Sequence, residues 1–120
     1  MRQRTLLGVG LIALLPLVAG PRPMREIVLI ARDMSFYLDN GTVPNPSIDV
    51  RRGEEIRLVF RNEDAGVTHV LAIETWDVAA DPLRVGGEST VIVRAPEQPG
   101  RYEYVCRPHA RMLRGYFEVR

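Results

Sequence analysis

Residues 100–115 read GRYEYVCRPHARMLRG, and the rest of the chain is best understood from this stretch. It holds Cys106, the only cysteine of the sequence, and His109, one of only two histidines. Met112 follows, so these three residues have Cys-x2-His-x2-Met spacing. The other histidine, His69, opens an apolar run far upstream, and it would reach the same site if two strand ends met in space.

These residue types together have the chemistry of a mononuclear copper site. A thiolate and two imidazoles in a near-trigonal plane, with a weak axial thioether, suit an ion that cycles between Cu(I) and Cu(II). Neither oxidation state then has its ideal geometry, so little has to move on electron transfer. The single cysteine excludes a binuclear thiolate-bridged copper centre, and it excludes zinc or iron–sulfur sites built from four cysteines.

Each residue also has an ordinary structural interpretation. Cys106 can be a buried thiol that continues the face formed by Tyr102 and Tyr104, because free cysteine packs well as a small hydrophobe. His109 can be a surface residue, and Met112 can be a packing residue. Their joint spacing, in a chain with only one other histidine, favours a metal site over these separate interpretations.

Residues 100–119 resemble the ligand loop of the cupredoxins, the small blue-copper proteins of the plastocyanin, pseudoazurin and amicyanin group. The matching pieces are the strand PGRYEYVC, the loop CRPH, a Met, a Gly and the final strand YFEV. Upstream, RLVFRNEDAGVTHVLAI resembles the strand with the first histidine ligand, so the likeness covers roughly residues 27–120. The resemblance implies one Cu(I)/Cu(II) ion per chain, with these ligands: His69, Cys106, His109 and Met112.

The loop departs from the short-loop form of the cupredoxins at one point. In that form one residue separates the axial methionine from the glycine, whereas here Leu113 and Arg114 lie between Met112 and Gly115. The axial position is therefore open between Met112, which we predict, and a shifted loop that brings Leu113 nearer to it.

Length and composition describe one ordinary folded domain. The chain has 120 residues, 46% of them hydrophobic and 26% charged, which suits a single core. A formal net charge of +1 is too small to indicate a nucleic-acid or membrane-surface ligand.

The N-terminus has the pattern of a secretory signal. A basic start, MRQR, is followed by an apolar run at residues 6–18 and small residues at 18–20. We therefore predict a signal peptide over residues 1–20, with an uncleaved N-terminal anchor as the alternative, and a copper-binding domain over residues 25–120. A signal implies a periplasmic or extracellular location.

From residue 26 onward the pattern is that of short strands. At residues 55–61 apolar residues alternate, with Val59 the one exception. Further runs bounded by turn residues lie at 26–31, 34–38, 47–50, 68–74, 89–94, 101–106 and 115–120. Asn62 and Asp64 fit a turn better than a ligand role. We predict an all-β fold, an antiparallel Greek-key β-sandwich of seven to eight strands.

The predicted function is one-electron transfer between redox partner proteins outside the cytoplasm, by a monomer that is not itself an enzyme. The electron would pass through the edge of His109 during brief docking. Two alternatives stay open: copper transport or storage, and a copper-bearing domain docked on a larger oxidoreductase assembly.

Overall fold

The computed structural model describes residues 7–16 and 23–120. Residues 7–16 form neither helix nor strand, and their side chains are exposed. In these two described segments, no helix has the length and hydrophobicity that a membrane crossing requires. The basic start and the small residues at 18–20 lie outside the described residues, so the signal peptide stays a prediction.

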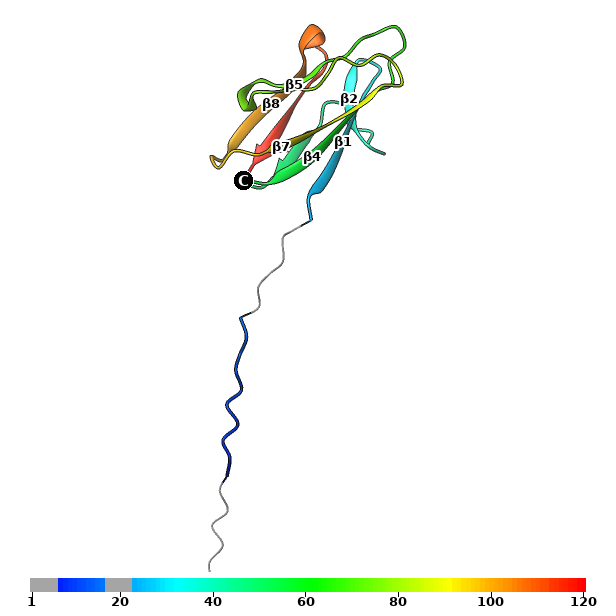
Figure 1. Cartoon of the computed structure of the whole chain (residues 1–120). Coiled ribbons are helices and arrows are strands. Elements are labelled where there is room, and N and C mark those ends of the chain that lie inside the picture. The colour runs from blue at the N-terminus through cyan, green and yellow to red at the C-terminus, as the bar shows by residue number, and fades with distance from the viewer. Residues whose placement is uncertain (1–6, 17–22) are drawn as a thin grey trace, which may run out of the picture.

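Two sheets pack face to face to form the domain (Figure 1). The first sheet has the order β2 (Ser35–Leu38), β1 (Arg25–Arg32), β4 (Glu55–Asn62) and β7 (Glu88–Arg94). The second has the order β3 (Ser47–Val50), β9 (Arg114–Val119), β8 (Gly100–Cys106), β5 (Leu71–Ile73) and β6 (Val78–Ala79). Two short 3-10 turns, η1 (Glu74–Trp76) and η2 (Arg107–His109), complete the described elements.

The predicted all-β sandwich is confirmed, but its sheets are mixed rather than purely antiparallel. β1 pairs with β4 in parallel, and β3 pairs with β9 in parallel. Alternating apolar residues identify the buried face of a strand, but they carry no information on the direction of its neighbour. The described strands number nine because Val78–Ala79 adds a two-residue edge strand that its sequence pattern does not reveal.

The run predicted as a strand at residues 68–74 is shorter in the structure. β5 covers only Leu71–Ile73, and His69 precedes it in an isolated antiparallel bridge with Leu83. Pro82 lies between Leu83 and the segment that pairs with β5, and it has no N–H to continue the ladder. His69 is therefore fixed beside a strand rather than within one.

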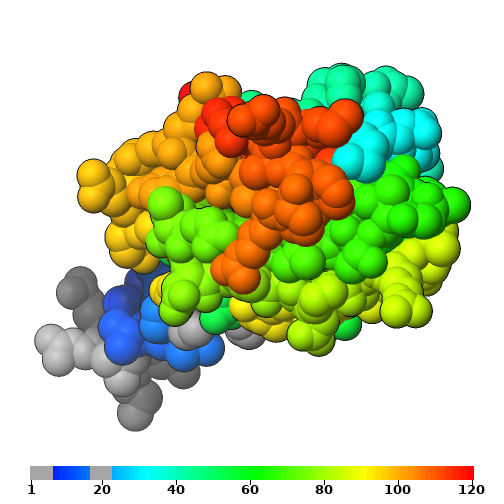
Figure 2. All heavy atoms as spheres, turned by 90° about the horizontal axis from the view of Figure 1, so that it is seen from above, coloured from blue at the N-terminus to red at the C-terminus, as the bar shows by residue number. Residues whose placement is uncertain are grey.

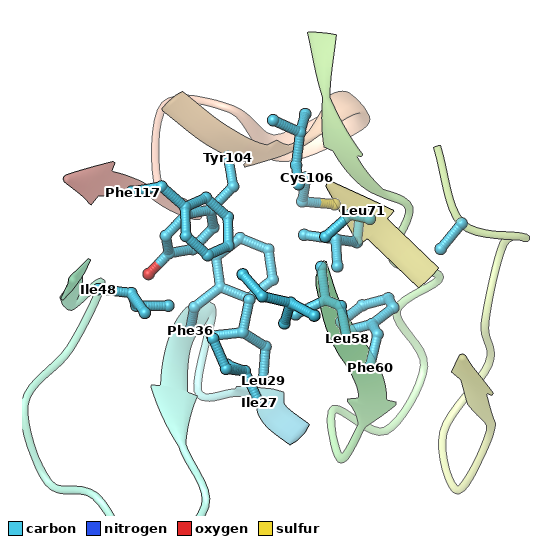
Figure 3. Packing of buried hydrophobic residues seen from close by; sticks show 14 of the residues in the cluster. Ile27, Leu29, Phe36, Ile48, Leu58, Phe60, Leu71, Tyr104, Cys106 and Phe117 are labelled. Atoms are coloured by element: carbon cyan, nitrogen blue, oxygen red, sulfur yellow. The ribbon is translucent and has the colours of Figure 1, made fainter. Parts of the chain in front are cut away.

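Aromatic side chains fill the space between the sheets (Figure 3). The ring of Phe36 lies 5.3 Å from that of Tyr104 and 6.1 Å from that of Phe60, in edge-on arrangements. Phe117 packs against Tyr104 at 5.3 Å. Because Tyr104 is fully buried two residues before Cys106, this cluster anchors the strand that carries the thiol.

Candidate metal centre

Cys106 is the last residue of β8 and is fully buried. Its backbone N–H donates to the carbonyl of Leu113 at 3.1 Å, which closes the loop between β8 and β9. Its Sγ accepts a hydrogen bond from the N–H of Val70 at 3.3 Å. The thiol is thus held at the junction of two chain segments that are far apart in sequence.

Burial is the main influence on the Cys106 thiol, and it raises the pKa of that group. The backbone N–H groups of Val70 and His109 oppose this shift, because they favour the thiolate. Because its pKa is raised, the Cys106 thiol stays protonated at neutral pH unless a positive charge, such as a metal ion, lies beside it.

His69 reaches the thiol from the other segment. Its side chain is fully buried, and its Nδ1 lies 3.4 Å from Cys106 Sγ. Its backbone exchanges two hydrogen bonds with Leu83, at 3.0 Å and 2.9 Å. The backbone of His69 is therefore held by Leu83, and its imidazole is oriented with Nδ1 toward the Cys106 sulfur.

His109 closes the third side of the cluster. It ends η2, and its Nδ1 lies 3.6 Å from Cys106 Sγ. Its ring centroid is 5.4 Å from that of His69, at an interplanar angle of 74°. Unlike His69, His109 is only partly buried. His109 is therefore the member of the cluster nearest to solvent. Figure 2 shows the loop after β8, in orange, at the surface of the molecule.

The three donor atoms fit around one metal ion. The sulfur and one ring nitrogen from each histidine all lie within 4.8 Å of one another. Bond lengths typical of zinc-bound thiolate and imidazole, about 2.3 Å and 2.0 Å, put such donors roughly 3.5 to 3.7 Å apart at tetrahedral to trigonal angles. The observed separations of 3.4 Å and 3.6 Å are close to this range. One thiolate with two imidazoles suits copper in particular.

Met112 and Leu113 differ in their surroundings. The side chain of Met112 is 55% exposed, whereas that of Leu113 is fully buried in the core cluster. The backbone N–H groups of both residues donate to the carbonyl of His109, and Asn45 Nδ2 donates to the Met112 carbonyl at 2.9 Å. Burial therefore favours Leu113 over Met112 for the axial position. This is the shifted-loop alternative that the two residues before Gly115 had left open.

The two ligand segments are tied together next to the site. The Arg107 guanidinium donates to both carboxylate oxygens of Glu74, at 2.6 Å and 3.1 Å. The Arg107 backbone N–H also donates to the carbonyl of Val70 at 3.1 Å. This backbone hydrogen bond joins Arg107, the residue after Cys106, to Val70, the residue after His69. It therefore helps to set the distance between Cys106 and His69.

One residue that the sequence pattern had indicated only as a turn former contacts the site directly. Asp64 Oδ2 lies 2.8 Å from Nε2 of His69, on the side of the imidazole away from the thiol. Burial alone would raise the pKa of Asp64, but hydrogen bonds from His69, Met34 and Asp33 lower it below its ordinary value. The carboxylate is therefore held in its charged form. Asp64 belongs to a turn sequence, NEDAG, which gives no signal for this second role.

Comparisons with known proteins agree with the fold. A family model described as "Cupredoxin-like domain" matches residues 24–119. Among solved structures, rusticyanin from Thiobacillus ferrooxidans matches with a TM-score of 0.68 at 19% identity, over 86% of this chain and 84% of that chain. Auracyanin B matches with a TM-score of 0.62 at 22% identity, over 86% and 94% of the two chains.

A third similar structure is part of a larger enzyme. A chain of a heme-copper terminal oxidase dimer matches with a TM-score of 0.62 at 17% identity, over 86% of this chain and 76% of that chain. A comparison with curated protein sequences found no match. At these identities the structural matches establish the shared fold.

Proposed function

Because the chain belongs to the cupredoxin-like family, we propose that it is a mononuclear type 1 copper protein that carries single electrons between redox partners. One observation carries the proposal: a buried thiol and two imidazoles meet with their donor atoms within 4.8 Å of one another. In this account Cys106, His69 and His109 form the metal plane. The axial position is open between Met112, which the loop spacing predicts, and Leu113, which burial favours.

Copper bound here would supply the one-electron couple, and the protein would supply a site that changes little between the two oxidation states. Cys106 is held by hydrogen bonds from Val70 and to Leu113, and His69 by its bridge to Leu83. These contacts lie within or beside the sheets, so they resist the rearrangement that each oxidation state would favour. No bond is made or broken, and for that reason we propose a carrier rather than an enzyme.

The partly buried His109 is the proposed route for the electron. It is the donor nearest to the surface, whereas His69 and Cys106 are fully buried. We propose that redox partner proteins dock briefly on this end of the sandwich, with a small interface, and that the protein acts as a monomer. The predicted signal at residues 1–20 supports a periplasmic or extracellular location, and an uncleaved anchor is its alternative.

Electron carriage and copper transport make different demands on the same ligands. A carrier keeps its copper and exchanges electrons quickly, whereas a transport or storage protein has to give its copper away. Voltammetry of the copper-loaded protein, paired with competition against a strong copper chelator, separates the two. We expect a reversible one-electron wave and slow loss of copper. Fast loss of copper with an irreversible wave would favour transport.

The match to a chain of a terminal oxidase dimer supports a second candidate, a domain docked on an oxidoreductase assembly. A docked domain would keep the same copper chemistry but would exchange electrons with one fixed neighbour. Size-exclusion chromatography of the protein from membranes and from the soluble fraction of its source distinguishes these arrangements. A free species no larger than the 13.5 kDa of the whole chain supports the diffusing carrier, and constant co-elution with a large complex supports the docked domain.

A further inference from the structure

Asp64 occupies the far side of the His69 imidazole from the cluster. Its Oδ2 is 2.8 Å from Nε2 of His69, while Nδ1 of the same ring is 3.4 Å from Cys106 Sγ. A carboxylate can only accept, so Nε2 carries the hydrogen and donates it to Asp64. In a neutral ring this leaves the lone pair of Nδ1 facing the sulfur, which is the side where a metal would bind.

The carboxylate is itself fixed on several sides. Its Oδ1 accepts from the N–H of Asp33 at 2.6 Å, and its Oδ2 also accepts from the N–H of Met34 at 3.2 Å. Asp33 and Met34 both have positive φ, at 50° and 57°, and they form the turn that joins β1 to β2. The N–H of Asp64 donates to Asn62 Oδ1 at 2.8 Å. Asp64 therefore connects the bend between β1 and β2 to the buried imidazole.

From this geometry we propose that Asp64 is a positioning residue of the copper site, which selects the metal-binding tautomer of His69 and biases the site toward Cu(II). The inference rests on the proposed function, because it needs copper at the cluster. Outer carboxylates that hold metal-bound histidines fix the ring orientation and raise the basicity of the ligand.

The bias toward Cu(II) follows from charge and burial. The side chain of Asp64 is only 11% exposed, so water screens its negative charge weakly. The oxidised site carries one more positive charge than the reduced site, and the nearby carboxylate therefore stabilises the oxidised site more. Removing the charge raises the reduction potential.

The variant D64N tests both parts of the proposal. Asparagine keeps the shape of the side chain and one acceptor oxygen, but it loses the charge and cannot serve the donors of Asp33 and His69 together. The matched control is E63Q, which neutralises an exposed carboxylate one position away in the same turn. Reduction potentials of the copper-loaded proteins, measured at one pH and one ionic strength, are then compared.

We expect D64N to raise the ratio of Cu(I) affinity to Cu(II) affinity by about tenfold, the lower end of the roughly 10- to 100-fold effects on metal affinity that changes of such outer residues have. For a one-electron couple this is a rise of about 59 mV in potential. E63Q should leave the potential unchanged. Equal shifts for the two variants, or no shift for D64N, would overturn the bias toward Cu(II).

A second measurement needs no copper and does not depend on the folding of a variant. Long-range ¹H–¹⁵N correlation spectra of the metal-free wild-type protein report which nitrogen of His69 carries the hydrogen. We expect Nε2–H, and a spectrum with Nδ1–H would overturn the positioning role. If the loaded wild-type protein lacks a copper–thiolate band, the proposed function and the bias toward Cu(II) fail together. If the band forms but D64N behaves as E63Q does, only the role of Asp64 fails.

Discussion

Replacement of Gly115 by alanine tests how β8 is held, because Gly115 lies directly opposite Tyr104 in the β8–β9 pair. A Cβ added at Gly115 would lie 2.1 Å from Tyr104 Oη and 2.2 Å from its Cζ. Real Cβ atoms do not approach so closely, so the ring or the strand has to move. Gly115 has no positive φ, and the expected effect is therefore purely steric.

The size of the effect follows from what the displaced ring would lose. Overpacking of a well-packed core costs about 1–3 kcal/mol. A shifted Tyr104 would also lose the hydrogen bond from its hydroxyl to the Pro46 carbonyl, worth about 1 kcal/mol. We therefore expect G115A to lower the free energy of unfolding by about 2–4 kcal/mol. For a domain of this size, that corresponds to a fall in Tm of at least roughly 8 °C.

Thermal unfolding of the metal-free protein, followed by circular dichroism, measures this change. The control is G66N, because nothing lies within 4 Å of a Cβ added at Gly66 and asparagine tolerates its φ of +75°. The control should change the free energy of unfolding by no more than about 0.5 kcal/mol. A G115A variant with the Tm of the wild type would refute the packing of Tyr104 against β9.

Two further predictions concern the loop and its tie to the neighbouring segment. Because the side chain of Met112 is exposed and that of Leu113 is buried, we expect M112A to leave the visible and electron paramagnetic resonance spectra of the copper protein unchanged and L113M to alter both. Altered spectra for M112A would instead support Met112, the ligand predicted from the sequence, as the axial group. The hydrogen bond from the Arg107 guanidinium lowers the pKa of Glu74 below its ordinary value of 4.5. The pair therefore stabilises the fold fully at pH values above 4.5, and this stabilisation is lost as the pH falls through the lowered pKa. Wild type should therefore exceed E74Q in Tm at pH 7 and lose that advantage in acid, whereas a difference that stays constant with pH would contradict the pairing.

The strands were the part of the fold that the sequence predicted well. In β4 the residues Ile56, Leu58 and Phe60 lie on one face, and all three are fully buried as expected, while Arg57 on the other face is exposed and only Val59 breaks the pattern. Alternation works here because side chains of a strand point to opposite faces. The direction of pairing depends instead on contacts between distant segments, so the parallel pairing of β1 with β4 could not be predicted from local sequence.

The metal cluster was predictable for a chemical reason. Few side chains bind soft metals, and a chain with one cysteine and two histidines leaves little choice. The structure brings His69, Cys106 and His109 together, whereas Met112 points to solvent and remains a prediction as a ligand. The extra residue before Gly115 was the only signal of that difference.

The role of Asp64 was not predictable from the sequence. Its partners Asp33 and Met34 lie about thirty positions upstream, and only the folded sheet brings them near His69. In a local window, an aspartate in NEDAG is explained fully by a turn. A residue that contacts a metal ligand on the side away from the metal has no fixed sequence spacing from that ligand. The structure was therefore needed to find Asp64.

The central claim is that Cys106, His69 and His109 bind copper as a type 1 site. It is tested most directly by visible absorption and electron paramagnetic resonance spectra of the purified protein after addition of Cu(II), beside a C106S control. The account predicts an intense visible band from copper–thiolate charge transfer, lost in the control. Weak spectra of tetragonal type, or no copper binding by the wild-type protein, would contradict it.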